Sequence, residues 1–307
     1  MNDSVEFGIG LRRMEHIALD AKAAEDLGYQ FVSTGEHVFF YGPVGNGLIQ
    51  LAAAAGATTS IKLMSAITLV PLYPAALLAK QVATLDSISG GRFNLGVGVG
   101  GEYAREFEAC GVPMNERGAR TNEALGLMKR LWTENNISFN GRFNTLSGVT
   151  LAPKPSPLPP IWISGRSEAA MRRCALHGDG WLPYMYTPER LRESLATITT
   201  YSSDVDRSAA VKPGLYIFFA VHEDRATGIK MATDRLSLQY NQDFSSLVGK
   251  YAIAGNPDNC IARLRAYIDA GARTIILNSA CPGEYVEENE RLLAQSVLPA
   301  LRDTRDH

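Results

Sequence analysis

The chain has 307 residues, of which 46% are hydrophobic and 20% charged, and its formal net charge is -2. Such a composition supports a full hydrophobic core, and the near balance of charge without runs of one sign predicts neither a nucleic-acid partner nor a membrane surface. The four cysteines form no C-x-x-C pair, and neither an apolar leader nor a membrane-length apolar run is visible, so we expect a cytoplasmic protein that acts on a small molecule.

The first half of the sequence alternates between strands and helices. Strands are expected at residues 5–10, 30–35, 61–68 and 92–97. Helices are expected at residues 14–27, 48–57 and 75–86, and a longer amphipathic helix is expected from a cap at Asn115. Asn140-Gly141 is typical of a tight turn and predicts a β-hairpin near residues 136–148, inserted into the alternation.

The second half continues the same alternation. Strands are expected at residues 161–163, 180–182, 215–221 and 274–278. Helices are expected at residues 167–176, from 187 onward, at 224–240, at 256–270 and at 292–301. Thr187-Pro188 and Asn256-Pro257 each combine a capping side chain with a proline in the first turn, which indicates where two of these helices begin. Residues 241–256 show no regular pattern and are a candidate lid.

Eight strands alternating with helices predict a (β/α)8 barrel, known as a TIM barrel, that forms one domain over residues 1–307. An open, doubly wound sheet is the alternative. In a barrel of this kind the active site lies at the carboxyl ends of the strands, so the residues that follow each strand are the candidates for function.

A glycine-rich run follows the fourth predicted strand, at residues 96–101. The spacing of Gly96, Gly98 and Gly101 fits the G-x-G-x-x-G fingerprint of a dinucleotide fold. We reject that interpretation because the fingerprint belongs on the first strand of its domain, whereas three strand-helix units come first here. The run still predicts a loop whose free amides cradle an anion.

The strand ends carry few groups that could perform chemistry. Among them only Glu36, His37, Glu102 and Arg166 titrate or bear a charge. The five histidines form no metal-binding pattern, and no lysine follows a strand, so neither a metal site nor a Schiff base is expected. The difficult chemistry therefore belongs to a bound cofactor.

Taken together, several motifs resemble the bacterial luciferase-like superfamily, whose members use coenzyme F420, a deazaflavin, or flavin on a TIM barrel. The resemblance spans residues 28–181 and is carried by Glu36-His37, 89–93, 96–100, 111–113, 160–165 and 178–183. It implies an oxidoreductase that transfers hydride between F420 and a small organic substrate, and a homodimer formed through the first half of the barrel. An FMN-dependent monooxygenase using reduced flavin and O2 is the alternative, and a non-catalytic relative that stores or senses the cofactor is a third possibility.

The resemblance also implies roles for individual residues. His37 is the catalytic proton donor or acceptor beside the cofactor ring, and Glu102 is a second catalytic candidate. The sugar-phosphate dehydrogenases of the superfamily have a carboxylate directly after the glycine loop, where this chain has Gly101, which weakens that substrate assignment. Spacing alone favours a structural loop histidine at position 37 and makes a solvated arginine as good an interpretation of Arg166 as a phosphate ligand.

The remaining residues implied by the resemblance hold the cofactor. They are Glu36, Ser65, Ala66, Thr68, Gly98, Val99, Gly100, Ser164, Gly165, Arg166 and Ser167. The third strand of the superfamily contains a non-prolyl cis peptide behind the ring. We expect it at Ser65-Ala66, with Ala66-Ile67 as the second choice.

Overall fold

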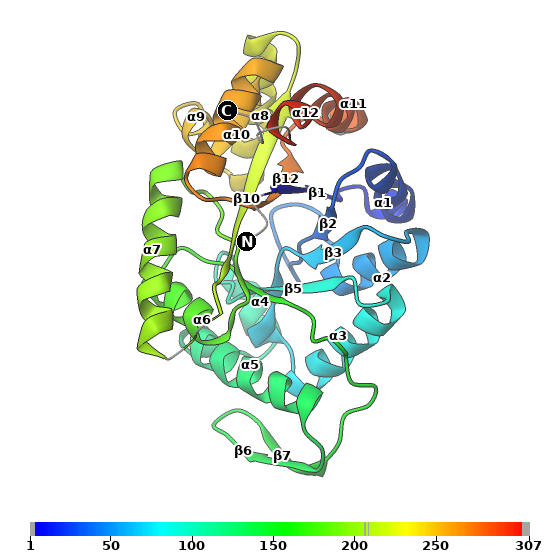
Figure 1. Ribbon diagram of the computed structural model, residues 1–307, viewed down its shortest axis with the longest axis vertical. Helices are drawn as coiled ribbons and strands as arrows, with labels where there is room; N and C mark the ends of the chain where they lie inside the picture. Colours follow the sequence, from blue (N-terminus) through cyan, green and yellow to red (C-terminus); the bar gives the residue numbers. More distant parts are fainter. Residues whose placement is uncertain (1–3, 206, 208, 303–307) are drawn as a thin grey trace.

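A computed structural model describes residues 4–205, 207 and 209–302 of the chain (Figure 1). The strands are β1 Glu6–Gly10, β2 Phe31–Thr34, β3 Lys62–Ser65, β4 Thr68–Leu69, β5 Phe93–Gly98, β6 Ile137–Asn140, β7 Thr145–Val149, β8 Ile161–Ile163, β9 Gly180–Trp181, β10 Lys212–Val221, β11 Ala252–Gly255 and β12 Thr274–Ser279. The α-helices are α1 Ile17–Asp26, α2 Gly47–Ala57, α3 Ala75–Ser89, α4 Ala104–Ala109, α5 Arg117–Thr133, α6 Glu168–His177, α7 Pro188–Asp204, α8 Arg225–Tyr240, α9 Val248–Tyr251, α10 Pro257–Asp269, α11 Val286–Leu292 and α12 Pro299–Arg302. Among these residues, none of the helices combines the length and apolar character that crossing a bilayer requires.

Eight parallel strands close into a barrel. The order around it is β1, β2, β3, β5, β8, β9, β10 and β12, and β12 pairs with β1 through Phe7 opposite Ile275. Because β9 also pairs with β10, the ring of these eight strands is closed, which excludes the doubly wound alternative. The predicted (β/α)8 barrel is therefore confirmed.

The barrel interior is filled by large apolar side chains. Phe31, Met64, Trp162, Leu182 and Ile276 form one buried cluster contributed by five different barrel segments. The Nε1 group of Trp162 donates to Asn94 Oδ1 at 3.1 Å, so its polar atom is satisfied inside the barrel. A larger apolar layer lies between the strands and the surrounding helices. The interior is a packed core, and ligands must bind at its ends.

Local sequence signals identify some helix starts and miss another. Thr187 accepts from the amide of Arg190, and Asn256 accepts from that of Asn259, as the two predicted caps require. The cap expected at Asn115 is wrong, because this residue lies in a 3-10 turn, Met114–Glu116, and α5 begins at Arg117 without a side-chain cap.

The inserted hairpin consists of β6 and β7, which pair only with each other and project away from the barrel (Figure 1). Asn140 pairs with Thr145, so the connection is longer than the two-residue turn that Asn140-Gly141 suggested. The carboxylate of Glu123 on α5 accepts hydrogen bonds from the amides of Arg142, Phe143 and Asn144. This tertiary contact replaces the local turn chemistry.

The stretch expected to be irregular, residues 241–256, contains regular structure. It includes α9 and then β11, which pairs with the carboxyl-terminal part of β10 through Phe218 opposite Ala252. The short apolar run Ala252-Ile253-Ala254 is too brief to be distinguished from loop by periodicity. The expectation of a wholly irregular segment is therefore wrong for residues 248–255.

Candidate active site

The predicted site residues follow neighbouring strands at one end of the barrel. Glu36 and His37 follow β2, which pairs with β3, and the segment from Ser65 to Thr68 joins β3 to β4. β5 pairs with β4 and β8, so the glycine loop after β5 lies beside the turn at Gly165 after β8. The fold thus brings these separate parts of the sequence to one edge.

Glu36 is buried, with 7% of its surface exposed, and both of its carboxylate oxygens accept hydrogen bonds from the protein. The amide of Leu69 donates to Oε1 at 2.8 Å, and the hydroxyl of Tyr73 donates to Oε2 at 2.9 Å. Burial raises the pKa of Glu36, and these two hydrogen bonds oppose that effect. Glu36 therefore connects the end of β2 to β4.

The cis peptide lies between Ala66 and Ile67, so the first-choice position, Ser65-Ala66, is wrong and the second choice is correct. Ser65 pairs with Thr34 across to β2, and the amide of Ala66 still donates to the carbonyl of Thr34 at 2.7 Å. The hydrogen bonds between β2 and β3 thus extend to Ala66, and the chain departs from this pairing at the Ala66-Ile67 peptide. The Ser65 hydroxyl accepts from the amide of Gly96 at 2.9 Å.

Two glycines of β5 lie so close to the β3–β4 segment that neither position has room for a Cβ atom. A Cβ at Gly96 would lie 1.8 Å from the carbonyl oxygen of Ser65, and one at Gly98 would lie 1.9 Å from Cδ1 of Ile67. Gly98 is buried inside β5, so its lack of a side chain makes room for Ile67. Close packing of β5 against the β3–β4 segment requires both glycines.

The main-chain amides of Gly100, Gly101 and Gly165 at this edge have no acceptor among the described residues. Gly100 and Gly101 have φ values of 62° and 117°, and Gly165 has φ of 150°. All three residues are half-buried. Free amides in glycine turns are suited to an anionic group, so this edge fits the phosphate-bearing tail of a cofactor.

The other tail candidates have protein partners or are buried. The amide of Ser164 donates to the carbonyl of Val97 at 2.8 Å, and Ser167 caps α6 through the amide of Ala170. Val99 is half-buried at the end of β5. The hydroxyl of Thr68 is buried and has no hydrogen-bond partner among the described residues.

His37 lies between two carboxylates. Its Nδ1 atom is 3.2 Å from Oε2 of Glu106, a fully buried residue of α4, and its Nε2 atom is 3.9 Å from Oε2 of Glu102. The amide of Val38 also donates to Glu106 Oε2 at 3.1 Å. The ring of Phe40 stacks on the imidazole with centroids 4.1 Å apart. These contacts fix the orientation of the His37 ring.

Glu102 is connected to Arg166 through Tyr184. The hydroxyl of Tyr184 donates to the Glu102 carboxylate, and the Arg166 guanidinium lies 4.8 Å from the centroid of the Tyr184 ring. Burial and the neighbouring charge of Glu102 raise the pKa of Tyr184, so its hydroxyl remains a donor at neutral pH. His37, Glu102 and Arg166 therefore belong to one continuous polar network.

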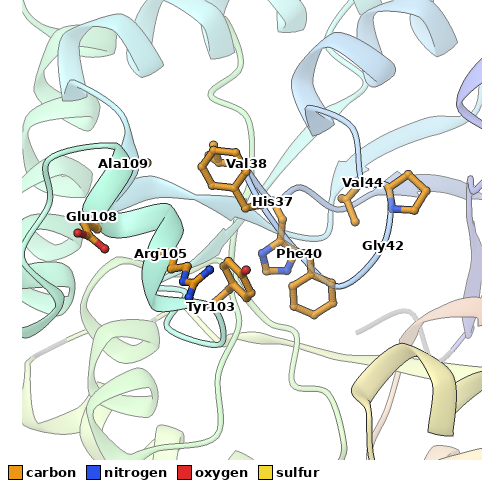
Figure 2. A pocket seen from close by; sticks show the side chains of 11 residues that line it. His37, Val38, Phe40, Gly42, Val44, Tyr103, Arg105, Glu108 and Ala109 are labelled. Atoms are coloured by element: carbon orange, nitrogen blue, oxygen red, sulfur yellow. The ribbon is translucent and has the colours of Figure 1, made fainter.

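A cavity of about 750 Å³ opens beside His37 (Figure 2). Its walls come from the loop after β2, including Phe40 and Val44, and from α4 and the residue before it, including Tyr103, Arg105 and Glu108. Phe40 and Tyr103 supply aromatic walls. Its volume suits a small organic molecule.

Two residues of this network, Glu106 and Tyr184, are missing from the predicted site. Glu106 lies in the six-residue helix α4, between the glycine loop and the Gly111-Val112-Pro113 motif, and no local pattern marks it as functional. Tyr184 lies in a loop with no recognisable pattern, 82 residues from its partner Glu102. Within the described part of the chain, no group of three or more His, Cys, Asp or Glu residues could hold a metal ion.

Comparison with known proteins agrees with this geometry. Residues 11–245 match the model of the luciferase-like monooxygenase family. The chain belongs to this family. A curated relative of this luciferase-like enzyme is the F420-dependent glucose-6-phosphate dehydrogenase of Amycolatopsis mediterranei, which is 24% identical and is matched over 98% of this chain and 94% of its own length.

Solved structures share the fold over nearly their whole length. The monooxygenase RslO1 from Streptomyces bottropensis is 26% identical with a TM-score of 0.85, covering 96% of this chain and 99% of that one. An F420-dependent secondary alcohol dehydrogenase is 19% identical with a TM-score of 0.87, covering 98% and 100%. The proteins it resembles thus include F420-dependent dehydrogenases and a monooxygenase, and this chain is a luciferase-like oxidoreductase acting on a small molecule.

Proposed function

We propose that this luciferase-like enzyme transfers hydride between coenzyme F420 and a small organic substrate, with His37 exchanging the proton that accompanies the transfer. The observation that carries the proposal is the position of His37 between Glu102 and Glu106 at the edge of a cavity. F420, when bound, supplies the carbon that gives or accepts hydride.

The two ring nitrogens of His37 have different surroundings. The buried carboxylate of Glu106 accepts from Nδ1, which keeps a proton on that atom and leaves Nε2 to exchange a proton with substrate. Glu102 lies on the Nε2 side and is 42% exposed at its side chain, so it provides a route for the proton to solvent. Glu106 is a positioning residue in this scheme.

The free amides of Gly100, Gly101 and Gly165 would hold the phosphate of the cofactor tail, with Arg166 adding a fixed positive charge. Ala66, Thr68, Val99 and the turn at Ser164 would line the path of the ring and tail. Glu36, Ser65, Gly98 and Ser167 contribute mainly by holding this backbone in place, since their own groups are engaged within the protein.

An FMN-dependent monooxygenase is the second candidate. It is favoured by the 26% identity to the monooxygenase RslO1 over almost the whole chain. Both cofactors carry a phosphate on their tail, so the amide cradle suits either of them.

Titration of the purified protein with F420 and with FMN, followed by fluorescence, separates these candidates. We expect F420 to bind at least about tenfold more tightly than FMN, which corresponds to about 1.4 kcal/mol. Tight FMN binding without F420 binding would establish the monooxygenase as the better proposal.

Replacing Glu106 by Gln tests the proton assignment. We expect the imidazole nitrogen NMR shifts of His37 to change, because Nδ1 no longer faces a carboxylate, and turnover to fall more than cofactor affinity. Glu193→Gln is the control, since Glu193 is an exposed carboxylate on α7 that does not line the cavity. Unchanged nitrogen shifts in Glu106→Gln would contradict the role of Glu106.

We further propose that the enzyme is a homodimer formed through α1, α2 and α3, which follow one another along one side of the barrel (Figure 1). These helices expose large apolar side chains, namely Leu19, Ile49, Leu77 and Ile88. Light scattering on wild type and on Ile49→Glu tests this: we expect a dimer that dissociates in the variant.

A further inference from the structure

A second cavity, of about 690 Å³, opens at the carboxyl-terminal ends of β1 and β12. Three segments line it: the residues after β1, the residues after β12, and one face of α8. Among the described residues, it shares no lining side chain with the cavity beside His37. None of the roles proposed above uses it.

Four cationic side chains line this second cavity, and two of them are neutralised by ion pairs. Arg13 pairs with Asp20 and Glu287, and Lys230 pairs with Asp234 at 2.5 Å. Arg12 and Arg235 form no ion pair with a described residue. Four cations against the three carboxylates Asp20, Glu287 and Asp234 leave a net charge of about +1, with both Arg12 and Arg235 lacking an ion-pair partner in the described part of the chain.

Arg12 and Arg235 are both half-buried and repel each other. Arg12 donates one hydrogen bond to the carbonyl of Ser279, and Arg235 has no hydrogen-bond acceptor among the described residues. Glu290 lies near Arg12 and accepts a hydrogen bond from the Ser279 hydroxyl at 3.0 Å, and burial raises its pKa to about 7. Two arginines left with unused donors in a cavity indicate that a bound anion completes the arrangement.

The rest of the cavity wall is largely apolar. Met231 and Leu238 come from α8, Cys281 and Pro282 follow β12, and Val286 begins α11. Burial raises the pKa of the Cys281 thiol to about 12, so this side chain is neutral and contributes an apolar sulfur. An inorganic anion would leave this apolar surface uncovered.

We propose that this cavity binds an organic anion with an apolar body, a medium-chain carboxylate, whose charged end contacts Arg12 and Arg235 while its hydrocarbon lies against Met231, Leu238 and Val286. The volume suits a molecule of this size. The proposal is independent of the cofactor proposed above, because binding requires neither F420 nor FMN.

Isothermal titration calorimetry of the full-length protein with octanoate tests this proposal. We expect saturable binding of one octanoate, with acetate and inorganic phosphate binding at least about tenfold more weakly because they leave the apolar wall uncovered. We expect Arg235→Gln to weaken octanoate binding by about tenfold or more, because a charge-assisted hydrogen bond is lost.

The matched control is Arg225→Gln, which removes an exposed arginine of the same helix and should bind octanoate as the wild type does. Leu238→Ser tests the apolar wall without touching a charge, and we expect a several-fold loss. Equal octanoate affinity in wild type and Arg235→Gln would overturn the proposal, as would inorganic phosphate binding as tightly as octanoate. Circular dichroism of each variant establishes that it is folded.

Discussion

The two sides of the barrel mouth differ in how their charged groups are satisfied. After β2 and β5, the buried carboxylates Glu36 and Glu106 have hydrogen-bond donors from the protein. Around the second cavity, the half-buried arginines Arg12, after β1, and Arg235, on α8, have donors that the protein leaves unused. A side whose polar groups are already paired is preorganised, whereas a side with unpaired charge requires a ligand to complete it.

This difference suits the two sides to different roles, chemistry at His37 and ligand binding at Arg235. The side at His37 is rigid, since a backbone amide, a tyrosine hydroxyl and an aromatic ring fix the residues that surround it. Chemistry that depends on the orientation of a single imidazole belongs there. The side at Arg235 offers charge and apolar surface but no fixed proton donor or acceptor, so it is suited to binding. The following four experiments test that contrast.

The largest effect is expected from His37→Ala. Turnover should fall by roughly 10² to 10⁴-fold, because a positioned acid-base group contributes about that much, while the cofactor dissociation constant changes little. Stopped-flow kinetics of F420 reduction with an alcohol or aldehyde panel measure this. His16→Ala, at an exposed histidine before α1, is the control. Wild-type turnover in His37→Ala would contradict the proposed acid-base role of His37.

The second effect concerns the packing that holds the His37 side in place. Gly96→Ala should lower the free energy of unfolding by about 3 kcal/mol or more, because its Cβ would meet a backbone oxygen that cannot move aside. Gly98→Ala should cost less, since the clash is with the end of the Ile67 side chain. Urea unfolding measures both, with Gly126→Ala in α5 as a control expected to be neutral or stabilising. Equal losses in all three variants would refute the steric argument.

The third effect concerns Glu290 on the Arg12 side, whose pKa burial raises to about 7, above the value of an exposed glutamate. Between the two pKa values the folded state holds a proton that the unfolded state has released, so the free energy of unfolding falls as pH rises from about 4.5 to about 7. Asp20 adds to this effect, and Arg13 and Arg12 oppose it. Glu290→Gln should therefore be about 1 to 3 kcal/mol more stable than wild type at pH 8 and nearly equal at pH 4.5. Thermal and urea unfolding at both pH values measure the difference, and an equal difference at both would contradict the assignment.

The smallest effect is expected from Tyr184→Phe. The variant loses the hydroxyl that donates to Glu102 but keeps the ring on which Arg166 stacks. We expect turnover to fall only a few-fold, since one hydrogen bond contributes about 1 kcal/mol. Tyr201→Phe, which removes an exposed hydroxyl bonded to Glu168, is the control. A loss as large as that of His37→Ala would make Tyr184, and not the histidine, the centre of the site.

The sequence by itself determined the barrel. Each barrel strand is a short apolar run, and each run is followed by a helix with its own spacing or cap, so the alternation is visible without any long-range information. It also located Glu36, His37 and the glycine loop, because strand ends in a barrel of this type meet at one edge. The sequence did not predict β11, because its four residues are too few to show the periodicity of a strand.

Only the tertiary structure decided which side chains meet. The partnership of His37 with Glu106 joins residues 69 positions apart, and that of Arg12 with Ser279 joins residues 267 apart. Hydrogen bonds over such separations depend on how strand ends and helices are arranged in three dimensions, and no local pattern encodes them. For the same reason, the unpaired charge of Arg235 becomes apparent only when every neighbouring carboxylate has been located, since a lone arginine in a helical sequence is indistinguishable from a solvated one.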